Sequence, residues 1–179
     1  MLITAVIVVG VLVLLDLVLT FGVIRRLREH TEQLGQAHHG PTDLICGKGT
    51  EIAGFAAVTT EGEQVSRGLL SGETLVGFLS PTCQPCEKLL PSFVEYAAAM
   101  PGGRDQVLVV IADDGPGKEK VPEKVAMVSP YARVVTEGYE GPLHKAFAVS
   151  GYPGVCLVRD GIVEVSGSSL DAFPDHVRR

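Results

Sequence analysis

The chain has 179 residues, of which 46% are hydrophobic, and it carries four cysteines and a formal net charge of −6. This length suits one compact domain with an appendage. The acidic balance argues against a nucleic-acid-binding protein, and four cysteines are too few for a disulfide scaffold in a chain this long.

The appendage is the N-terminus, because residues 2–24 are almost wholly apolar. As a helix with a rise of ~1.5 Å per residue, this segment spans about 35 Å and can cross a hydrocarbon core of about 30 Å. It lacks the basic start and the small-residue cleavage site of a secretory signal peptide. We therefore expect residues 1–24 to be an uncleaved transmembrane anchor, in which Asp16 is either a tolerated carboxyl or a functional contact.

Residues 25–50 are predicted to be a polar tether. Three arginines between residues 25 and 28 flank the apolar segment, and a stretch rich in His, Gly and Pro follows. His38 and His39 with the distant Cys46 match no compact zinc spacing, so an unliganded linker is favoured. The role of Cys46 stays open, because this thiol is either free or bridged to something outside the chain.

The folded domain is predicted over residues 51–170, with a tail at 171–179. It begins with a β-hairpin, since two strand-like runs between residues 52 and 66 flank the turn-forming Glu61 and Gly62.

A β-to-α-to-β step follows the hairpin. Residues 75–79 predict a buried strand, and residues 83–100 predict a helix because their apolar residues recur at helical spacing. The apolar run QVLVVIA at 106–112 is typical of a strand buried on both faces of a parallel sheet. The remaining expected elements are a strand at 133–136, a short helix at 143–149, and a hairpin of strands 155–159 and 162–166. This mixture predicts a three-layer α/β domain.

Cys83 and Cys86 form a C-x-x-C motif where the predicted strand gives way to the predicted helix. Unpaired N–H groups and a partial positive charge at a helix N-terminus stabilise a thiolate and can lower its pKa to about 7 or below. Cys83 is therefore the expected nucleophile, and Cys86, one turn deeper on the same face, is expected to resolve the mixed disulfide. Half of a zinc site and a pair of structural cysteines remain alternatives, although no second C-x-x-C accompanies the motif.

The sequence FLSPTCQPC at 78–86, with the Leu-Leu-Pro run at 89–91, resembles the active-site strand and kinked helix of thioredoxin-like proteins. Tyr152 and Pro153 match the position of the family's cis-proline. The hairpin and the apolar N-terminus resemble TlpA-like disulfide reductases, and FLSPTCQPC is similar to methylamine-utilisation accessory proteins of MauD type. The resemblance covers residues 51–169 or so.

This resemblance implies a thioredoxin fold, with a central mixed β-sheet flanked by helices. It implies catalytic roles for Cys83, Cys86 and Pro153, with no cofactor and no metal. It also implies disulfide- or dithiol-containing partner proteins and an upstream electron donor. A cis Tyr152–Pro153 bond would offer the Tyr152 backbone to substrate as a pairing edge beside the sulfurs, whereas a trans proline at a strand start is the alternative.

Some positions depart from the family pattern. Many thioredoxins carry a tryptophan directly before the first cysteine and a buried carboxylate in the active strand, and here these positions are Thr82 and Gly77. Glu73 or Glu87 is a candidate replacement for the carboxylate, although an exposed side chain is the commoner state for each. Cys156, in an apolar strand, is expected to be a small buried hydrophobe and not a third redox thiol.

Two other functions would use the same cysteines. A peroxiredoxin-like peroxidase shares the fold, but it has a single peroxidatic cysteine with a threonine three residues before it, where this chain has Ser80. A tethered copper(I)-binding module would use both thiolates as soft ligands, but no methionine or histidine cluster lies near them in the sequence.

The side of the membrane is predicted from two opposing arguments. Arginines directly after the apolar segment favour a cytoplasmic domain by the positive-inside rule. The resemblance favours the exterior, where disulfides persist, and long folded domains translocate largely regardless of flanking charge. We therefore expect a single-pass protein of the cell membrane with an extracytoplasmic thioredoxin-like domain.

Overall fold

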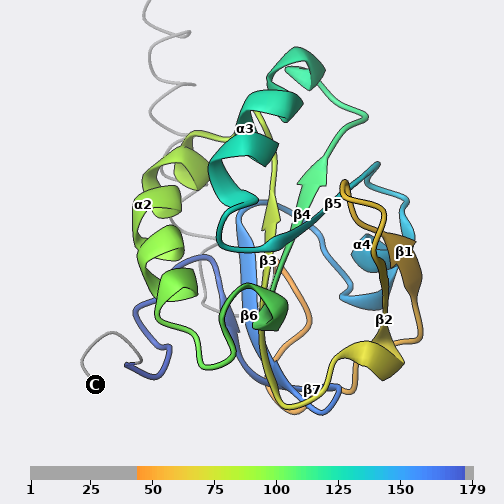
Figure 1. Cartoon of the computed structure of the whole chain (residues 1–179), viewed down its shortest axis with the longest axis vertical. Coiled ribbons are helices and arrows are strands. Elements are labelled where there is room, and N and C mark those ends of the chain that lie inside the picture. Colours follow the sequence, from red (N-terminus) through yellow and green to blue (C-terminus); the bar gives the residue numbers. More distant parts are fainter. Residues whose placement is uncertain (1–43, 176–179) are drawn as a thin grey trace, which may run out of the picture. The chain divides into compact units, whose positions relative to one another are not determined.

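A computed structural model describes residues 44–175 of the chain (Figure 1). The predicted anchor at 1–24 and most of the predicted tether lie outside these residues. Within the described range, no helix combines the length and apolar character needed to cross a membrane.

The described chain alternates strands and helices as the sequence predicts. In chain order its elements are β1 (Ala56–Val58), β2 (Gln64–Ser66), the 3-10 turn η1 (Arg67–Leu69), β3 (Glu73–Leu79), α2 (Gln84–Ala98), η2 (Gly103–Gln106), β4 (Val107–Ala112), η3 (Lys118–Lys120), α3 (Val121–Val128), β5 (Arg133–Glu137), α4 (Pro142–Ala146), β6 (Gly154–Arg159) and β7 (Ile162–Gly167).

Five of these strands form one mixed sheet in the order β5-β4-β3-β6-β7. Strands β3, β4 and β5 are parallel, as the apolar run of β4 predicts. Strand β6 pairs antiparallel with β3, and β7 pairs antiparallel with β6 through the expected hairpin. The β1–β2 hairpin forms a separate two-stranded sheet, so both predicted hairpins and the central mixed sheet are confirmed.

Side chains of the central strands alternate between two apolar clusters. Leu75 and Leu79 of β3 belong to the cluster that α2 and α3 cover, here called the α2-side cluster. Val76 and Phe78 belong to the cluster that contains residues of α4 and of the β1–β2 hairpin, here called the α4-side cluster. Figure 1 shows α2 and α3 on one side of the sheet and α4 on the other. Burial of each Val, Leu or Phe contributes about 1.5–3 kcal/mol, so the three layers are held together through β3 and β4.

Packing extends beyond the predicted limits of 51–170. Ile45 and Cys46, which fall in the predicted tether, are buried to 4% and 9% exposure and join the α4-side cluster. Phe173, in the predicted tail, packs its ring against Tyr96 of α2. Short apolar stretches at both ends therefore complete the core.

Helix α3 is an element that the sequence patterns did not single out. It has eight residues and begins next to a proline, and only Val121 and Val128 are buried. Such a narrow apolar stripe gives a weak helical periodicity. The crossover helix expected over β4 is nevertheless present.

Gly77 allows the ring of Phe93 to pack directly on the β3 backbone. A Cβ atom at residue 77 would lie 2.8 Å from Cε2 and 2.9 Å from Cζ of Phe93, closer than carbon atoms approach in a packed core. The space that a carboxylate occupies in many thioredoxins is therefore filled by an aromatic ring from α2.

We predict that Gly77→Ala lowers the free energy of unfolding by about 1–3 kcal/mol, because the new methyl group overpacks the site. Chemical denaturation measures this change. Gly68→Ala is the matched control, since a Cβ there meets nothing within 4 Å. In a Phe93→Leu background the cost of Gly77→Ala should fall, and an equal cost in both backgrounds would contradict the contact.

Candidate active site

The cysteine pair lies at the N-terminus of α2, directly after the loop that follows β3. Cys83 is the N-cap residue, and its Sγ accepts a hydrogen bond from the Cys86 backbone N–H at 3.1 Å. Pro85 occupies the first turn, where its missing N–H leaves no helical bond unmade. Cys83 and Cys86 are joined by a disulfide. Cys83 is half-buried and Cys86 is buried, so the first sulfur is the more accessible one.

Pro153 lies at the same end of the sheet as the cysteine pair. The Tyr152–Pro153 peptide bond is cis, which confirms that prediction. Gly154, the next residue, pairs with Phe78 near the end of β3, and the cysteine loop begins just beyond that end. Cys83 and Tyr152 both pack against the α2-side cluster. The fold thus brings all three predicted site residues to one edge of the domain.

Of the two glutamates considered as replacements for the missing carboxylate, only Glu87 lies beside the pair. Glu73 begins β3, at the opposite end of the strand, and forms an ion pair with Arg159. Glu87 and Lys124 line a small cavity together with Cys86, and Lys124 Nζ lies 3.4 Å from Glu87 Oε1. A carboxylate at this place can accept the proton that the Cys86 thiol loses when it attacks a disulfide.

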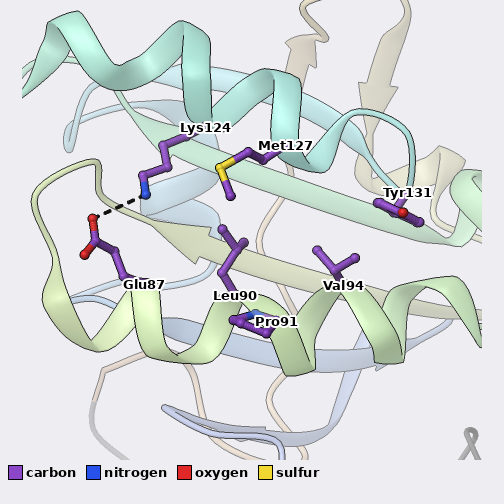
Figure 2. Close-up of a pocket in the computed structure, with 7 residues that line it drawn as sticks. All are labelled: Glu87, Leu90, Pro91, Val94, Lys124, Met127 and Tyr131. Atoms are coloured by element: carbon purple, nitrogen blue, oxygen red, sulfur yellow. Dashed lines mark hydrogen bonds and ion pairs between the residues drawn. The ribbon is translucent and has the colours of Figure 1, made fainter.

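The same ion pair closes one end of an apolar groove between α2 and α3. Figure 2 shows Glu87 and Lys124 facing each other, with Leu90, Pro91 and Val94 along α2 and Met127 and Tyr131 on the opposite wall. The groove has a volume of about 450 Å³. Glu87, Leu90 and Lys124 line both this groove and the cavity beside Cys86, so the two hollows share a wall.

A buried polar network lies near Pro153, and sequence reasoning did not identify it. His144 of α4 is 2% exposed, with ring nitrogens bonded to Glu137 at the end of β5 and to the Tyr152 hydroxyl. These partners are seven and eight residues from His144 on different elements. No helical or strand periodicity would have joined them.

The other two cysteines lie in the α4-side cluster, across the sheet from the disulfide. Both are free and buried. Burial raises the pKa of the Cys46 thiol, although a backbone hydrogen bond partly opposes the rise. Burial, followed by the neighbouring Cys46, raises the pKa of the Cys156 thiol well above its usual value. Cys156 is fully buried, which confirms that it packs as a small hydrophobe.

Among residues 44–175, no three His, Cys, Asp or Glu side chains are grouped so that they could hold a metal ion. These residues therefore contain no preformed metal site.

Comparison with solved structures identifies the architecture. The chain is similar to a candidate thioredoxin from Neisseria meningitidis, with a TM-score of 0.57 and 23% identity over 70% of this chain and 84% of that one. The fold is thioredoxin-like. StoA from Bacillus subtilis has a TM-score of 0.51 and 24% identity over 65% of this chain and 87% of its own. A thioredoxin-family thiol:disulfide interchange protein from Chlorobium tepidum has a TM-score of 0.54 and 20% identity over 73% and 94%.

Comparisons of the sequence alone give no match. No protein-family model matches the chain, and no curated protein matches it either. The comparison that identifies the thioredoxin-like fold is therefore the one of three-dimensional structures. In this fold, the C-x-x-C motif and the cis-proline lie at the same end of the central sheet.

We predict that one thiol of the reduced, folded protein reacts rapidly with iodoacetamide near neutral pH, and that this thiol is Cys83. It combines access with the helix N-terminus, whereas Cys46 and Cys156 are buried with raised pKa values. Mass spectrometry of the alkylated peptides measures each rate. Modification of Cys156 as fast as Cys83 would contradict this assignment, and unfolding in denaturant should make all four thiols react.

Proposed function

We propose that this protein is a thiol–disulfide oxidoreductase that exchanges disulfides with partner proteins through Cys83 and Cys86. The observation that carries the proposal is their disulfide at the N-terminus of α2, at the edge of the sheet where the cis Tyr152–Pro153 bond also lies. Solved structures with the same fold include a thiol:disulfide interchange protein, which supports the same activity here.

The reducing direction begins with both cysteines as thiols. The Cys83 thiolate, stabilised by the helix N-terminus and by the Cys86 N–H, attacks one sulfur of a substrate disulfide. A Cys83–substrate disulfide forms, and the other substrate sulfur leaves as a thiolate and takes up a proton. Cys86 then loses its proton, with Glu87 as the nearby acceptor, and attacks Cys83. The substrate is released as a dithiol. It has gained two electrons from Cys83 and Cys86, which are now joined as a disulfide.

A separate thiol donor must return the pair to the reduced state for another turnover. The same steps run in reverse would oxidise a substrate dithiol. Pro153 serves binding in either direction, because its loop presents the Tyr152 backbone as a short pairing edge for an extended substrate segment.

A peroxiredoxin-like peroxidase is the weaker reading of this site. If Cys83 were the peroxidatic cysteine of such an enzyme, a threonine would be expected three residues before it, but residue 80 is a serine. Cys83 is instead bonded to a cysteine only three residues away, as an exchange cycle requires.

We also propose that the protein is a TlpA-like disulfide reductase, related to MauD-type accessory proteins, held at the membrane by residues 2–24. The support is the sequence itself: a long apolar segment followed by arginines, and the phrase FLSPTCQPC. We propose that its oxidoreductase domain lies outside the cytoplasm, where protein disulfides persist.

We predict that Cys83→Ser abolishes disulfide exchange, because it removes the attacking sulfur. Cys86→Ser should still attack, but it cannot release its partner, so mixed disulfides accumulate. Non-reducing electrophoresis and mass spectrometry of the full chain, expressed in cells, detect these adducts. Cys156→Ala is the matched control, since it removes a thiol from the opposite face of the sheet. If Cys86→Ser forms no adduct that Cys83→Ser lacks, the exchange mechanism is wrong.

For the topology, we predict that a membrane-impermeant thiol reagent labels Cys83 in intact cells after mild reduction. An extracytoplasmic domain exposes this thiol without lysis. Cys83→Ser supplies the background signal. Labelling that appears only after lysis would place the domain in the cytoplasm and overturn the proposed location.

A further inference from the structure

A line of hydrogen-bonded side chains connects the end of β5, through α4, to the loop before β6. His144 Nδ1 lies 2.8 Å from Glu137 Oε1, and His144 Nε2 lies 2.7 Å from the Tyr152 hydroxyl. His144 is almost fully buried, and its side chain and that of Glu137 are 1% and 9% exposed. Buried polar groups are costly unless each finds a partner, and here both ring nitrogens of His144 have one.

The Glu137 end of the line is fixed by the backbone of α4. Its carboxylate accepts hydrogen bonds from the backbone N–H groups of Leu143 and His144, at 3.3 and 2.8 Å. Gly141 leaves room for the carboxylate, because a Cβ at that position would lie 2.4 Å from Glu137 Cδ. The carboxylate is thus held in one place before it meets the imidazole.

The imidazole ring is fixed by aromatic neighbours on two elements. Its centroid lies 5.2 Å from that of Phe78, in an edge-on arrangement, and 5.7 Å from that of Tyr152. Phe78 is the residue of β3 that pairs with Gly154. The same strand that leads to the cysteines therefore also orients His144.

The Tyr152 phenol keeps its proton at the His144 end of the line. Burial, with smaller effects of Asp114, Tyr139 and Glu137, raises the pKa of Tyr152 to about 12. The hydroxyl pairs with His144 Nε2. A carboxylate oxygen accepts, so His144 Nδ1–H donates to Glu137. Both ring nitrogens of His144 thus have a partner.

The loop that ends in Pro153 is held from both sides. On one side Ser150 donates its backbone N–H to the Leu44 carbonyl at 2.9 Å, and the Leu44 side chain packs where a Cβ of Gly151 would be. On the other side the Tyr152 hydroxyl is hydrogen-bonded to the buried His144. The backbone between these two points is the edge that the proposed function assigns to substrate docking.

We infer that Glu137 and His144 are positioning residues for the binding of protein substrates. They act through the Tyr152 hydroxyl and hold the loop of residues 150–153 in its docking conformation. This inference rests on the proposed function. Neither residue needs to touch the reacting sulfurs, so the effect belongs to substrate binding and not to the chemical step.

Insulin reduction by the full chain, with dithiothreitol as electron donor, tests the inference. We expect Tyr152→Phe to raise KM for insulin about tenfold, the effect of about 1.4 kcal/mol in binding, with kcat changed less than twofold. Reduction of the Cys83–Cys86 disulfide by dithiothreitol alone, which needs no docking edge, should change less than twofold as well. Tyr139→Phe is the matched control, because it removes a hydroxyl from an exposed ring beside Tyr152 and leaves the line intact.

A conservative replacement separates positioning from packing. Glu137→Gln retains an acceptor oxygen for His144 and should keep KM within about threefold of the parent value, whereas Glu137→Leu should raise KM as Tyr152→Phe does. If Glu137→Gln and Glu137→Leu raise KM equally, or if all variants lower kcat in step with thermal stability, the role is structural only and the inference is overturned.

Hydrogen exchange distinguishes failure of the inference from failure of the proposed function. The Ser150 amide should exchange about tenfold faster in Tyr152→Phe than in the parent chain, whatever the substrate. Unchanged exchange together with an unchanged KM overturns the inference and leaves the oxidoreductase intact. A parent chain that does not reduce insulin at all overturns both.

Discussion

The antiparallel pairing of β3 with β6 is the constraint on which the rest of the site depends. Its register sets Gly154 opposite Phe78, although the two residues are far apart in the sequence. The cysteines follow β3 and the cis-proline precedes β6, so this one pairing brings the cysteine pair and the cis-proline to the same end of the sheet. Because a shift by one residue would turn every side chain of β6 to the other face, the two buried clusters also protect the register.

The chemistry of the pair depends on what surrounds the first turn of α2. The helix N-terminus favours a thiolate on Cys83, and the backbone N–H of Cys86 already points at that sulfur. Beneath the pair, Phe93 fills the space above Gly77, so no carboxylate can act from below. The ionisable side chains that line the cavity beside Cys86 are instead Glu87 and Lys124. Under the proposed function, Glu87 is therefore the candidate acceptor for the Cys86 proton.

Much of the fold could be predicted from the sequence because its strands are strongly apolar and its turns carry glycine. The run VLVVIA of β4 predicts a central strand, and Asp160 with Gly161 predicts the β6–β7 turn. Helix α3 escaped prediction because it buries too few residues to show a periodicity. The early boundary of the domain escaped it because Leu44, Ile45 and Cys46 form only a three-residue apolar run in a polar stretch.

The site divides in the same way. Cys83, Cys86 and Pro153 belong to short motifs whose meaning is local, so the sequence is enough to propose them as site residues. The line from Glu137 to Tyr152 depends on three elements meeting at one end of the sheet, and each of its residues is unremarkable where it stands in the sequence. Only the tertiary structure shows that a histidine in a five-residue helix is enclosed between a carboxylate and a phenol.

The placement of the cysteines on opposite faces of the sheet has a consequence for oxidative folding. Cys83 and Cys86 pack with the α2-side cluster, whereas Cys46 and Cys156 pack in the α4-side cluster. Four cysteines allow three pairings into two disulfides, and two of these three link a thiol of one face to a thiol of the other. Once the sheet has formed, its backbone separates the faces and forbids both. If β3, β4 and β6 assemble before the thiols meet an oxidant, the folded sheet itself therefore prevents these two mispairings.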